Sequence, residues 1–283
     1  MKKRFSIAYT DGGTAEGASG RFAYTVASGF SETSFSLVGG AVRPETIAAA
    51  RAAGLAIEAL YLPSESVDLF WASDTYKKSA QDVLPSDAPV PDEATWEMLF
   101  SLYNSYFSFA VRLGIERVVL TPAVGQALPP VSQGALARFR TVAACAKEKG
   151  VRLLIENGAS APHFEAVVRT CADGFHGVSF SPARAFHHFG TSSLPPYAAE
   201  HLMRLSLDDA AKGTFGYLPT DGDTDFRPFA KSLAPLHFRG TLAIAPDASL
   251  PAYAELDHFA FSSRAYDKLS ALLRLLKREE GVI

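Results

Sequence analysis

Residues 143–174 read AACAKEKGVRLLIENGASAPHFEAVVRTCADG, and this stretch contains one full repeat of the fold that the chain is expected to adopt. A helical pattern precedes the short apolar run VRLLIE at 151–156, which has the length of a buried strand. Asn-Gly at 157–158 is by itself typical of a hairpin turn. The segment behind it has Pro162 near its start, helical spacing and Gly174 at its end. We therefore expect a second helix there and a strand-to-helix loop at 157–158.

The same alternation of strand and helix patterns continues along the chain and indicates an α/β protein with parallel strands. Strands are expected at 34–39, 55–61, 66–72, 116–121, 151–156, 177–181, 202–207 and 241–245. Eight such units favour a (β/α)8 TIM barrel with an extra N-terminal segment, in a single domain over 1–283. The barrel is assigned to 34–283. Residues 1–33 are then an added hairpin, formed by RFSIAYT and RFAYTVAS, or an irregular first unit.

Composition excludes several classes of function. The chain is 48% hydrophobic and 20% charged, with a net charge of −3, so no basic surface for nucleic acid is expected. The longest uncharged apolar run, 98–111, is too short to span a membrane. The basic first residues do not continue into a secretory signal. Cys145 and Cys171 belong to no CxxC pair and are expected to be reduced thiols in a cytoplasmic protein.

Three motif-like segments fail on chemical grounds. DGGTAEGASG at 11–20 has glycines at phosphate-loop spacing, but it lacks the lysine that contacts the phosphates. DGDTDF at 221–226 resembles a calcium loop, yet Phe226 stands where the glycine is required. His187 and His188 are adjacent, and in a strand they would point to opposite faces, which suits a shared metal poorly.

In a TIM barrel the chemistry lies at the carboxyl ends of the strands. The order and the residue patterns of several segments there resemble those of the xylose-isomerase-like barrels. This superfamily contains sugar and sugar-phosphate isomerases and epimerases, and it also includes endonuclease IV. The resemblance covers roughly 34–280. It is carried by AAARAAGLAIEALYLP, AVRLGIERVVLTPA, AACAKEKGVRLLIENG and GDTDF, which place Glu58, Glu156, Asp225 and Phe226 at matching positions.

The resemblance implies a strand-end metal site of Glu, Asp, His and Glu, and this chain departs from it. Glu156 holds the first position, but Ser181, Ser206 and Ala245 hold the others. One carboxylate and two hydroxyls are a poor ligand set for Mn²⁺ or Mg²⁺. The sequence therefore predicts no metal site and no cofactor. The sequence also lacks the dense cluster of zinc ligands and the basic DNA-binding face that an endonuclease of this type requires.

Two hypotheses for function remain open. The first is a divergent sugar or sugar-phosphate isomerase or epimerase with a degenerate metal site, in which Glu156 is the acid/base. The second is a barrel that has lost this activity and binds a carbohydrate or a partner protein. Where the ligand is a small molecule, we expect a carbohydrate or a sugar phosphate. The candidate contact residues lie on predicted mouth loops or strand ends and are Arg184, Ser181, Ser206, Asp209, Trp71 and His187.

Each candidate also has a simpler structural explanation. Glu156 is either a retained functional group or a solvated carboxylate at a strand end. Arg184 pairs with Glu156, holds a substrate carboxylate or phosphate, or is a surface arginine on a loop. Trp71 stacks on a sugar ring or is a core aromatic residue. Asp209, with its neighbour Asp208, contacts a ligand or only caps its loop.

Overall fold

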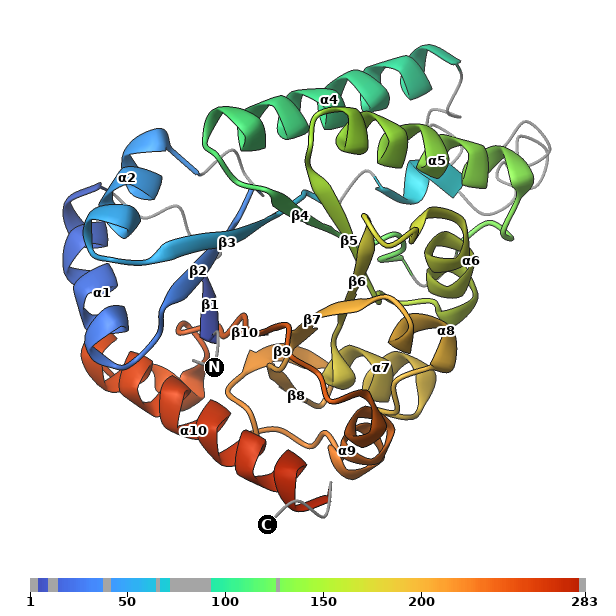
Figure 1. Ribbon diagram of the computed structural model, residues 1–283. Coiled ribbons are helices and arrows are strands. Elements are labelled where there is room, and N and C mark those ends of the chain that lie inside the picture. The colour runs from blue at the N-terminus through green and yellow to red at the C-terminus, as the bar shows by residue number, and fades with distance from the viewer. Residues whose placement is uncertain are drawn as a thin grey trace.

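The computed structural model describes residues 5–9, 15–37, 42–64, 67–71, 93–125 and 128–279. Eight parallel strands form a closed barrel in the spatial order β1-β10-β7-β6-β5-β4-β3-β2, with helices outside it (Figure 1). The barrel strands are β1 Phe5–Tyr9, β2 Glu32–Ser36, β3 Ala56–Tyr61, β4 Arg117–Leu120, β5 Arg152–Glu156, β6 Gly177–Phe180, β7 Leu202–Ser206 and β10 Thr241–Ile244. This is a (β/α)8 TIM barrel, as the sequence predicts.

The outer layer consists of helices that follow the strands. They are α1 Ala15–Ala27, α2 Pro44–Ala52, α4 Glu93–Arg112, α5 Gln133–Glu148, α6 Ala161–Cys171, α7 Pro182–Phe189, α8 Pro196–Ala199, α9 Arg227–Leu233 and α10 His258–Glu279, with short 3-10 helices η2 Val67–Trp71, η3 Ala234–Leu236 and η4 Pro251–Tyr253. Among the residues described, no helix is both long and apolar enough to cross a membrane.

Helix α5 illustrates how the local sequence builds one unit. The Ser132 hydroxyl accepts a hydrogen bond from the backbone N–H of Ala135 at 3.2 Å and caps the helix. Phe139 is fully buried on the inner face, where it stacks on Phe70. Burying a side chain of this size contributes about 1.5–3 kcal/mol. After the helix, Gly150 has a φ of 73°, a conformation that favours glycine, and turns the chain into β5.

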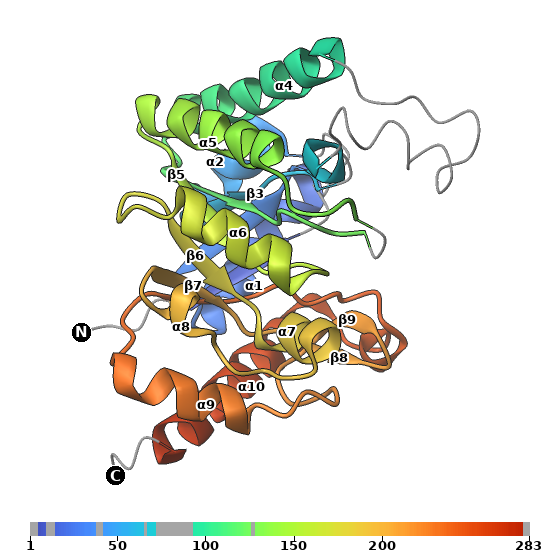
Figure 2. The same cartoon turned by 90° about the vertical axis from the view of Figure 1, so that its right-hand side faces the viewer.

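The loop after β7 contains a small antiparallel hairpin, β8 Asp209–Ala211 and β9 Thr214–Tyr217. Lys212 and Gly213 both have positive φ, as in the two-residue turns that suit the twist of hairpins. The hairpin lies beside α7 at one end of the barrel (Figure 2). Because it follows the carboxyl end of β7, this is the end where active sites of TIM barrels lie.

The barrel begins before residue 34, so its expected start was wrong. Phe5–Tyr9 is β1 and pairs in parallel with both β10 and β2, so it completes the barrel. The hairpin between RFSIAYT and RFAYTVAS does not form, because residues 15–27 are a helix. Phe22 and Thr25 lie three positions apart on its buried face. The alternating pattern of 21–28 was therefore helical, and the described part of the N-terminal segment is the first barrel unit.

The third expected strand, 66–72, is also wrong. Residues Val67–Trp71 form the 3-10 helix η2 instead. The Asp68 carboxylate accepts backbone N–H bonds from Val124 at 3.0 Å and Gly125 at 2.8 Å, which fixes this turn beside the end of β4. The other seven expected strands are confirmed within one or two residues at most ends.

The C-terminal helix α10 begins at His258. Asp257 serves as the cap, since its carboxylate accepts the backbone N–H of Ala260 at 2.8 Å. Cys145 and Cys171 are both buried free thiols. Burial raises the pKa of the Cys171 thiol to about 12.

Candidate functional site

A fully buried arginine occupies the middle of the barrel. Arg204 points inward from β7, and its Nε donates to Glu58 Oε2 at 3.0 Å. Its Nη1 lies 3.4 Å from Glu156 Oε1. The two carboxylates come from β3 and β5, so one guanidinium bridges three strands. TIM barrels usually fill this space with layers of branched apolar side chains, so the buried charge is a departure that requires these partners.

Neutral groups complete the surroundings of Arg204. Its Nη1 donates to Ser179 Oγ at 3.0 Å, and the Ser179 hydroxyl donates to Glu156 Oε1 at 2.8 Å. Its Nη2 donates to the Tyr61 hydroxyl at 2.5 Å. Burial raises the pKa of Tyr61 to about 12, although the positive charge of Arg204 acts in the opposite direction. Tyr61 is therefore a neutral hydrogen-bonding group at ordinary pH.

Alternating charges extend from this centre toward both ends of the barrel. Toward the amino-terminal end, Arg117 Nη1 lies 3.4 Å from Glu58 Oε1. Toward the carboxyl-terminal end, Arg184 Nη1 lies 3.7 Å from Glu156 Oε2. The order Arg117, Glu58, Arg204, Glu156, Arg184 thus alternates in sign along the barrel. Each carboxylate is flanked by two guanidinium groups, which offset the cost of burying its charge.

The hydrogen bonding of the last pair in this series, Glu156 and Arg184, is incomplete. Glu156 is 1% exposed, and its Oε2 has no hydrogen-bond donor among the described residues. The Arg184 guanidinium also makes no hydrogen bond within that part of the chain, because 3.7 Å exceeds hydrogen-bond length. The first turn of α7 positions Arg184, and the Ser181 hydroxyl caps this turn by accepting the Arg184 backbone N–H at 3.2 Å.

A second carboxylate, Asp208, lies directly after β7. Burial raises the pKa of Asp208 to about 6, while Arg184 acts to lower it and Glu156 to raise it. The Ser206 hydroxyl donates to Asp208 Oδ1 at 3.3 Å. When two carboxylates at one site lie in unlike environments, one can serve as the acid and the other as the base.

A cavity of about 710 Å³ opens at this end of the barrel. Its wall includes Arg184, Asp208 and Phe215 on one side, and Arg21 and the start of α10 on the other. Glu156 is not part of the wall. A ligand in the cavity therefore meets Arg184 and Asp208 first. The volume falls within the range of small-molecule sites, roughly 300–1,000 Å³.

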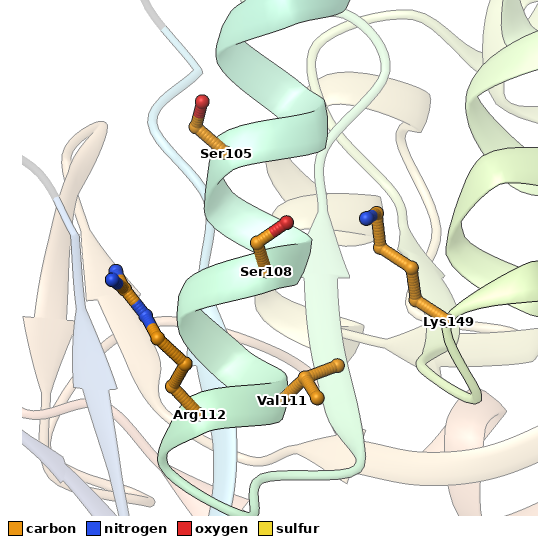
Figure 3. A pocket seen from close by; sticks show the side chains of 5 residues that line it. All are labelled: Ser105, Ser108, Val111, Arg112 and Lys149. Atoms are coloured by element: carbon orange, nitrogen blue, oxygen red, sulfur yellow. The ribbon is translucent and has the colours of Figure 1, made fainter.

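Another hollow, of about 510 Å³, lies far from this chemistry. It is formed on the outer helices by Ser105, Ser108, Val111, Arg112 and Lys149 (Figure 3). Arg112 and Lys149 stand at the ends of α4 and α5, which is the amino-terminal side of the strands. In TIM barrels that side serves stability rather than catalysis.

Four of the candidate residues from the sequence come together at the mouth. Glu156, Ser181, Arg184 and Ser206 lie within one hydrogen-bonded or ion-paired neighbourhood. Asn157 supports it, because its side-chain amide donates to the Ser181 carbonyl at 2.9 Å and its Oδ1 accepts the Ser181 N–H at 2.7 Å.

The other three candidates lie elsewhere. Trp71 is fully buried, and its Nε1 donates to the Pro122 carbonyl at 2.7 Å. Asp209 accepts backbone N–H bonds from Ala210, Gly222 and Thr224 at 2.8–3.2 Å, which shape the hairpin loop. His187 Nε2 lies 3.0 Å from Asp223 Oδ1. Contact of these three residues with a ligand stays a prediction.

The sequence did not point to Arg204 or Tyr61 as site residues, and it pointed to Asp208 only as the neighbour of Asp209. A signal for Arg204 was present, because LMRLSL places it two positions before Ser206 and so on the same inward face of the strand. Nothing local in the sequence, however, identifies which carboxylates an inward arginine will meet.

The residues at the mouth do not fit the divalent metal that the fold family implies. Ser181, Ser206 and Ala245 occupy the ligand positions, and Glu156 already lies between the guanidinium groups of Arg204 and Arg184. Within the described ranges, no group of three or more His, Cys, Asp or Glu side chains is arranged to hold a metal ion. A cation beside Glu156 would be repelled by both arginines.

No protein-family model and no curated protein matches the chain. Solved structures do match over almost the whole length. D-allulose 3-epimerase from Methylomonas sp., solved with D-allulose, is 14% identical, has a TM-score of 0.68 and covers 97% of each chain. An L-ribulose 3-epimerase is 14% identical with a TM-score of 0.68, covering 99% of this chain and 98% of its own. A xylose isomerase domain protein from Planctomyces limnophilus is 15% identical with a TM-score of 0.63, covering 99% and 98%. At such identities the likeness establishes the fold alone, and the chain is thus a TIM barrel similar in structure to xylose-isomerase-like sugar isomerases and epimerases.

Proposed function

We propose that this chain binds a small sugar or sugar phosphate at its carboxyl-terminal mouth and catalyses an isomerase- or epimerase-type proton transfer on it. The observation that carries the proposal is the unsatisfied pair at the mouth: among the described residues Glu156 Oε2 has no donor, and the Arg184 guanidinium 3.7 Å away makes no hydrogen bond with any of them. A sugar offers both missing partners, since each hydroxyl can donate to the carboxylate and accept from the guanidinium.

Two carboxylates would divide the proton transfers. Glu156 removes the proton from the carbon beside the ketose carbonyl, and that C–H electron pair becomes the C=C bond of an enediol. Asp208 gives its proton to the carbonyl oxygen, whose π electrons become the new O–H bond. Reversal of these steps at the neighbouring carbon isomerises the sugar. In epimerisation Asp208 would instead give its proton to the opposite face of the same carbon, while Arg184 would hold the negative charge of the enediolate oxygen.

The protonation state of Asp208 supports this role. With a pKa of about 6, roughly a tenth of Asp208 stays protonated at pH 7, which is far more than for an ordinary aspartic acid and provides the general acid. Arg184 lies on the cavity wall and would stabilise negative charge on the enediolate oxygen. Among the structural relatives, the Methylomonas sp. enzyme was solved with D-allulose and a D-psicose 3-epimerase from Clostridium cellulolyticum H10 with D-tagatose.

A second candidate function is sugar binding without catalysis, and one observation favours it. Glu156 accepts a hydrogen bond from Ser179 and is flanked by Arg204 and Arg184. All three contacts hold the carboxylate inside the barrel. Glu156 also lies behind the cavity wall, so Arg184 would have to shift before Glu156 could reach a carbon-bound proton.

Exchange of carbon-bound hydrogen for solvent deuterium distinguishes catalysis from sugar binding without catalysis. The protein would be incubated in D₂O with D-fructose, D-allulose, D-tagatose and their 6-phosphates, and deuterium on the carbons beside the carbonyl would be followed by NMR. The proposal expects exchange with at least one sugar, abolished in Glu156→Gln and Asp208→Asn. Glu165→Gln, which removes only an exposed partner of Arg169 on α6, is the matched control and should retain it. Binding without exchange would favour the second candidate, and no binding of any sugar would refute both.

A further inference from the structure

We infer that Asn157 is a positioning residue of the mouth. Its side-chain amide holds the first turn of α7 against the end of β5, and so keeps Arg184 and Glu156 at the separation that a ligand hydroxyl bridges. Arg184 Nη1 and Glu156 Oε2 are 3.7 Å apart, which exceeds hydrogen-bond length. The inference rests on the proposed function, because it names a residue on which ligand binding at the same site depends.

The Asn157 side chain extends the pairing of two strands beyond their ends. The ladder between β5 and β6 stops at Glu156 and Ser179. Beyond it, Asn157 Oδ1 accepts the Ser181 backbone N–H at 2.7 Å and Asn157 Nδ2 donates to the Ser181 carbonyl at 2.9 Å. We call these two hydrogen bonds the amide bridge. A side-chain amide can replace a peptide group in this way because it offers the same donor and acceptor.

Ser181 transmits this constraint to Arg184. It is the residue that caps α7, and its hydroxyl accepts the Arg184 backbone N–H at 3.2 Å. Its carbonyl also accepts the Ala185 N–H at 3.1 Å, which is the first hydrogen bond of the helix. Asn157 and Ser181 are both fully buried, so water does not compete for the amide bridge. The backbone of Arg184 is therefore fixed relative to the end of β5.

The loop that carries Asn157 is itself held in place. Gly158 lies so close to the loop after β4 that a Cβ atom there would be 1.9 Å from the Ala123 carbonyl oxygen. The Ala159 N–H donates to the same carbonyl at 2.9 Å. The Asn-Gly sequence thus provides an amide on one side and room for a close backbone contact on the other. Asn157 is anchored on β4 while it holds the residue after β6.

The guanidinium of Arg184 has a support of its own. Its central carbon lies 5.9 Å from the centre of the Phe215 ring, which belongs to the hairpin after β7. His188 stacks on the same ring with centroids 5.6 Å apart. Arg184 is thus restrained at its backbone by the amide bridge and at its head group by an aromatic ring.

A simpler role for Asn157 is to satisfy the buried backbone groups of Ser181 and nothing more. Under that role, replacing Asn157 would destabilise the fold but would not act through Arg184. A double-mutant cycle separates the two roles. If Asn157 acts by positioning Arg184, its replacement should weaken ligand binding only while Arg184 is present.

Amide hydrogen exchange followed by NMR tests the amide bridge without a ligand. Asn157→Ala removes the acceptor of the Ser181 N–H, so the Ser181 and Arg184 amides should exchange at least about tenfold faster, while amides in α10 keep their rates. Asn104→Ala is the matched control, because this amide contacts only Cys145 on the outer helices among the hydrogen bonds of its side chain in the described chain. Unchanged rates at Ser181 and Arg184, or faster exchange throughout the barrel, would overturn the inference.

Titration calorimetry with D-fructose, D-allulose and D-tagatose tests whether Asn157 acts through Arg184. Asn157→Ala should bind the preferred sugar at least about tenfold more weakly, because a small misplacement of a contact group is costly. In an Arg184→Met background the same substitution should change affinity less than about twofold, and Asn104→Ala should bind like the wild type. Independent, multiplying losses from Asn157→Ala and Arg184→Met would overturn the inference.

Asn157→Asp serves in the same cycle if Asn157→Ala does not fold. It keeps the shape of the side chain and an acceptor for the Ser181 N–H, but it cannot donate to the Ser181 carbonyl. The same dependence on Arg184 is expected. Wild-type sugar affinity in Asn157→Asp would contradict the need for the complete amide bridge.

Failure of this inference and failure of the proposed function give different results. Sugar binding and deuterium exchange that persist unchanged in Asn157→Ala would overturn the inference and leave the proposed function standing. Sugar binding that depends on Asn157 through Arg184, without deuterium exchange in the wild type, would support the positioning role and refute the proposed catalysis. No binding of any sugar to the wild type would refute the proposed function and overturn the inference with it.

Discussion

Arg204 and Glu58 form a fully buried ion pair inside the barrel, with Arg204 Nε 3.0 Å from Glu58 Oε2 and neither side chain exposed. They are 146 residues apart in the sequence. The Ser34 hydroxyl donates to the same carboxylate oxygen at 2.9 Å, so Glu58 is held by an arginine and a hydroxyl from different strands. The pair anchors the series of alternating charges that ends at the mouth.

Removing Arg204 should destabilise the fold strongly. Arg204→Met leaves Glu58 and Glu156 buried without the cation between them, and breaking a buried pair in this way costs about 3–5 kcal/mol. Urea denaturation monitored by circular dichroism measures the free energy of unfolding. Arg169→Met removes an exposed pair and should cost under about 1 kcal/mol. Similar costs for the two variants would contradict the role assigned to Arg204.

Asp208 should make stability fall as pH rises between its two pKa values. Its pKa is raised from 3.8 to about 6 in the folded state, so the folded chain binds more protons than the unfolded chain between those values. Its contribution is complete below pH 4 and is lost as pH rises through 6, by roughly 2–3 kcal/mol in all.

Asp208→Asn should remove this part of the pH dependence, which urea denaturation at pH 4, 5, 6 and 7 would measure. The control is Asp173→Asn, because Lys147 first lowers the pKa of Asp173 to about 2, so its contribution to stability changes below pH 4 and its removal should leave the slope between pH 4 and 7 unchanged. An unchanged slope in Asp208→Asn would show that the carboxyl titrates normally.

Trp71 should act through packing and have no effect on ligand affinity. Its ring is tilted against Phe139 with centroids 4.9 Å apart, and it meets His163 edge-on at 4.4 Å. Trp71→Ala should lower the free energy of unfolding by about 3–5 kcal/mol. Trp71→Phe keeps most of the packing, and its affinity for sugars in calorimetry should equal that of the wild type. A selective loss of sugar binding in Trp71→Phe would restore the stacking role.

Divalent cations should leave the thermal stability unchanged. A metal that binds only the folded state raises the melting temperature, and the mouth offers Glu156 between two guanidinium groups with hydroxyls or a methyl group at the other ligand positions. Differential scanning fluorimetry with Mn²⁺, Mg²⁺ and Zn²⁺ should therefore show no shift. A shift that disappears in Glu156→Gln would demonstrate a metal at this carboxylate.

The local sequence pattern was sufficient to predict most strands and helices of the barrel. Strands such as 151–156 and helices such as α5 follow from hydrophobic spacing and caps, which depend on neighbours in the sequence. The failures at α1 and η2 have one cause. Short apolar runs fit strands and helices alike, and closure of the barrel or a contact such as Asp68 with the Val124 N–H decides between them.

The sequence by itself determined the repeat, the strand ends and the substitutions Ser181, Ser206 and Ala245, because each of these depends on position along the chain. Only the tertiary structure decided that Arg204 meets Glu58 and Glu156, and that Arg184 faces an oxygen without a donor. It also decided that Trp71 is buried in the core and that burial raises the pKa of the Asp208 carboxyl. These outcomes depend on which strands become neighbours when the barrel closes, and on how much water is removed from their side chains. Neither can be read from the spacing of residues along the chain.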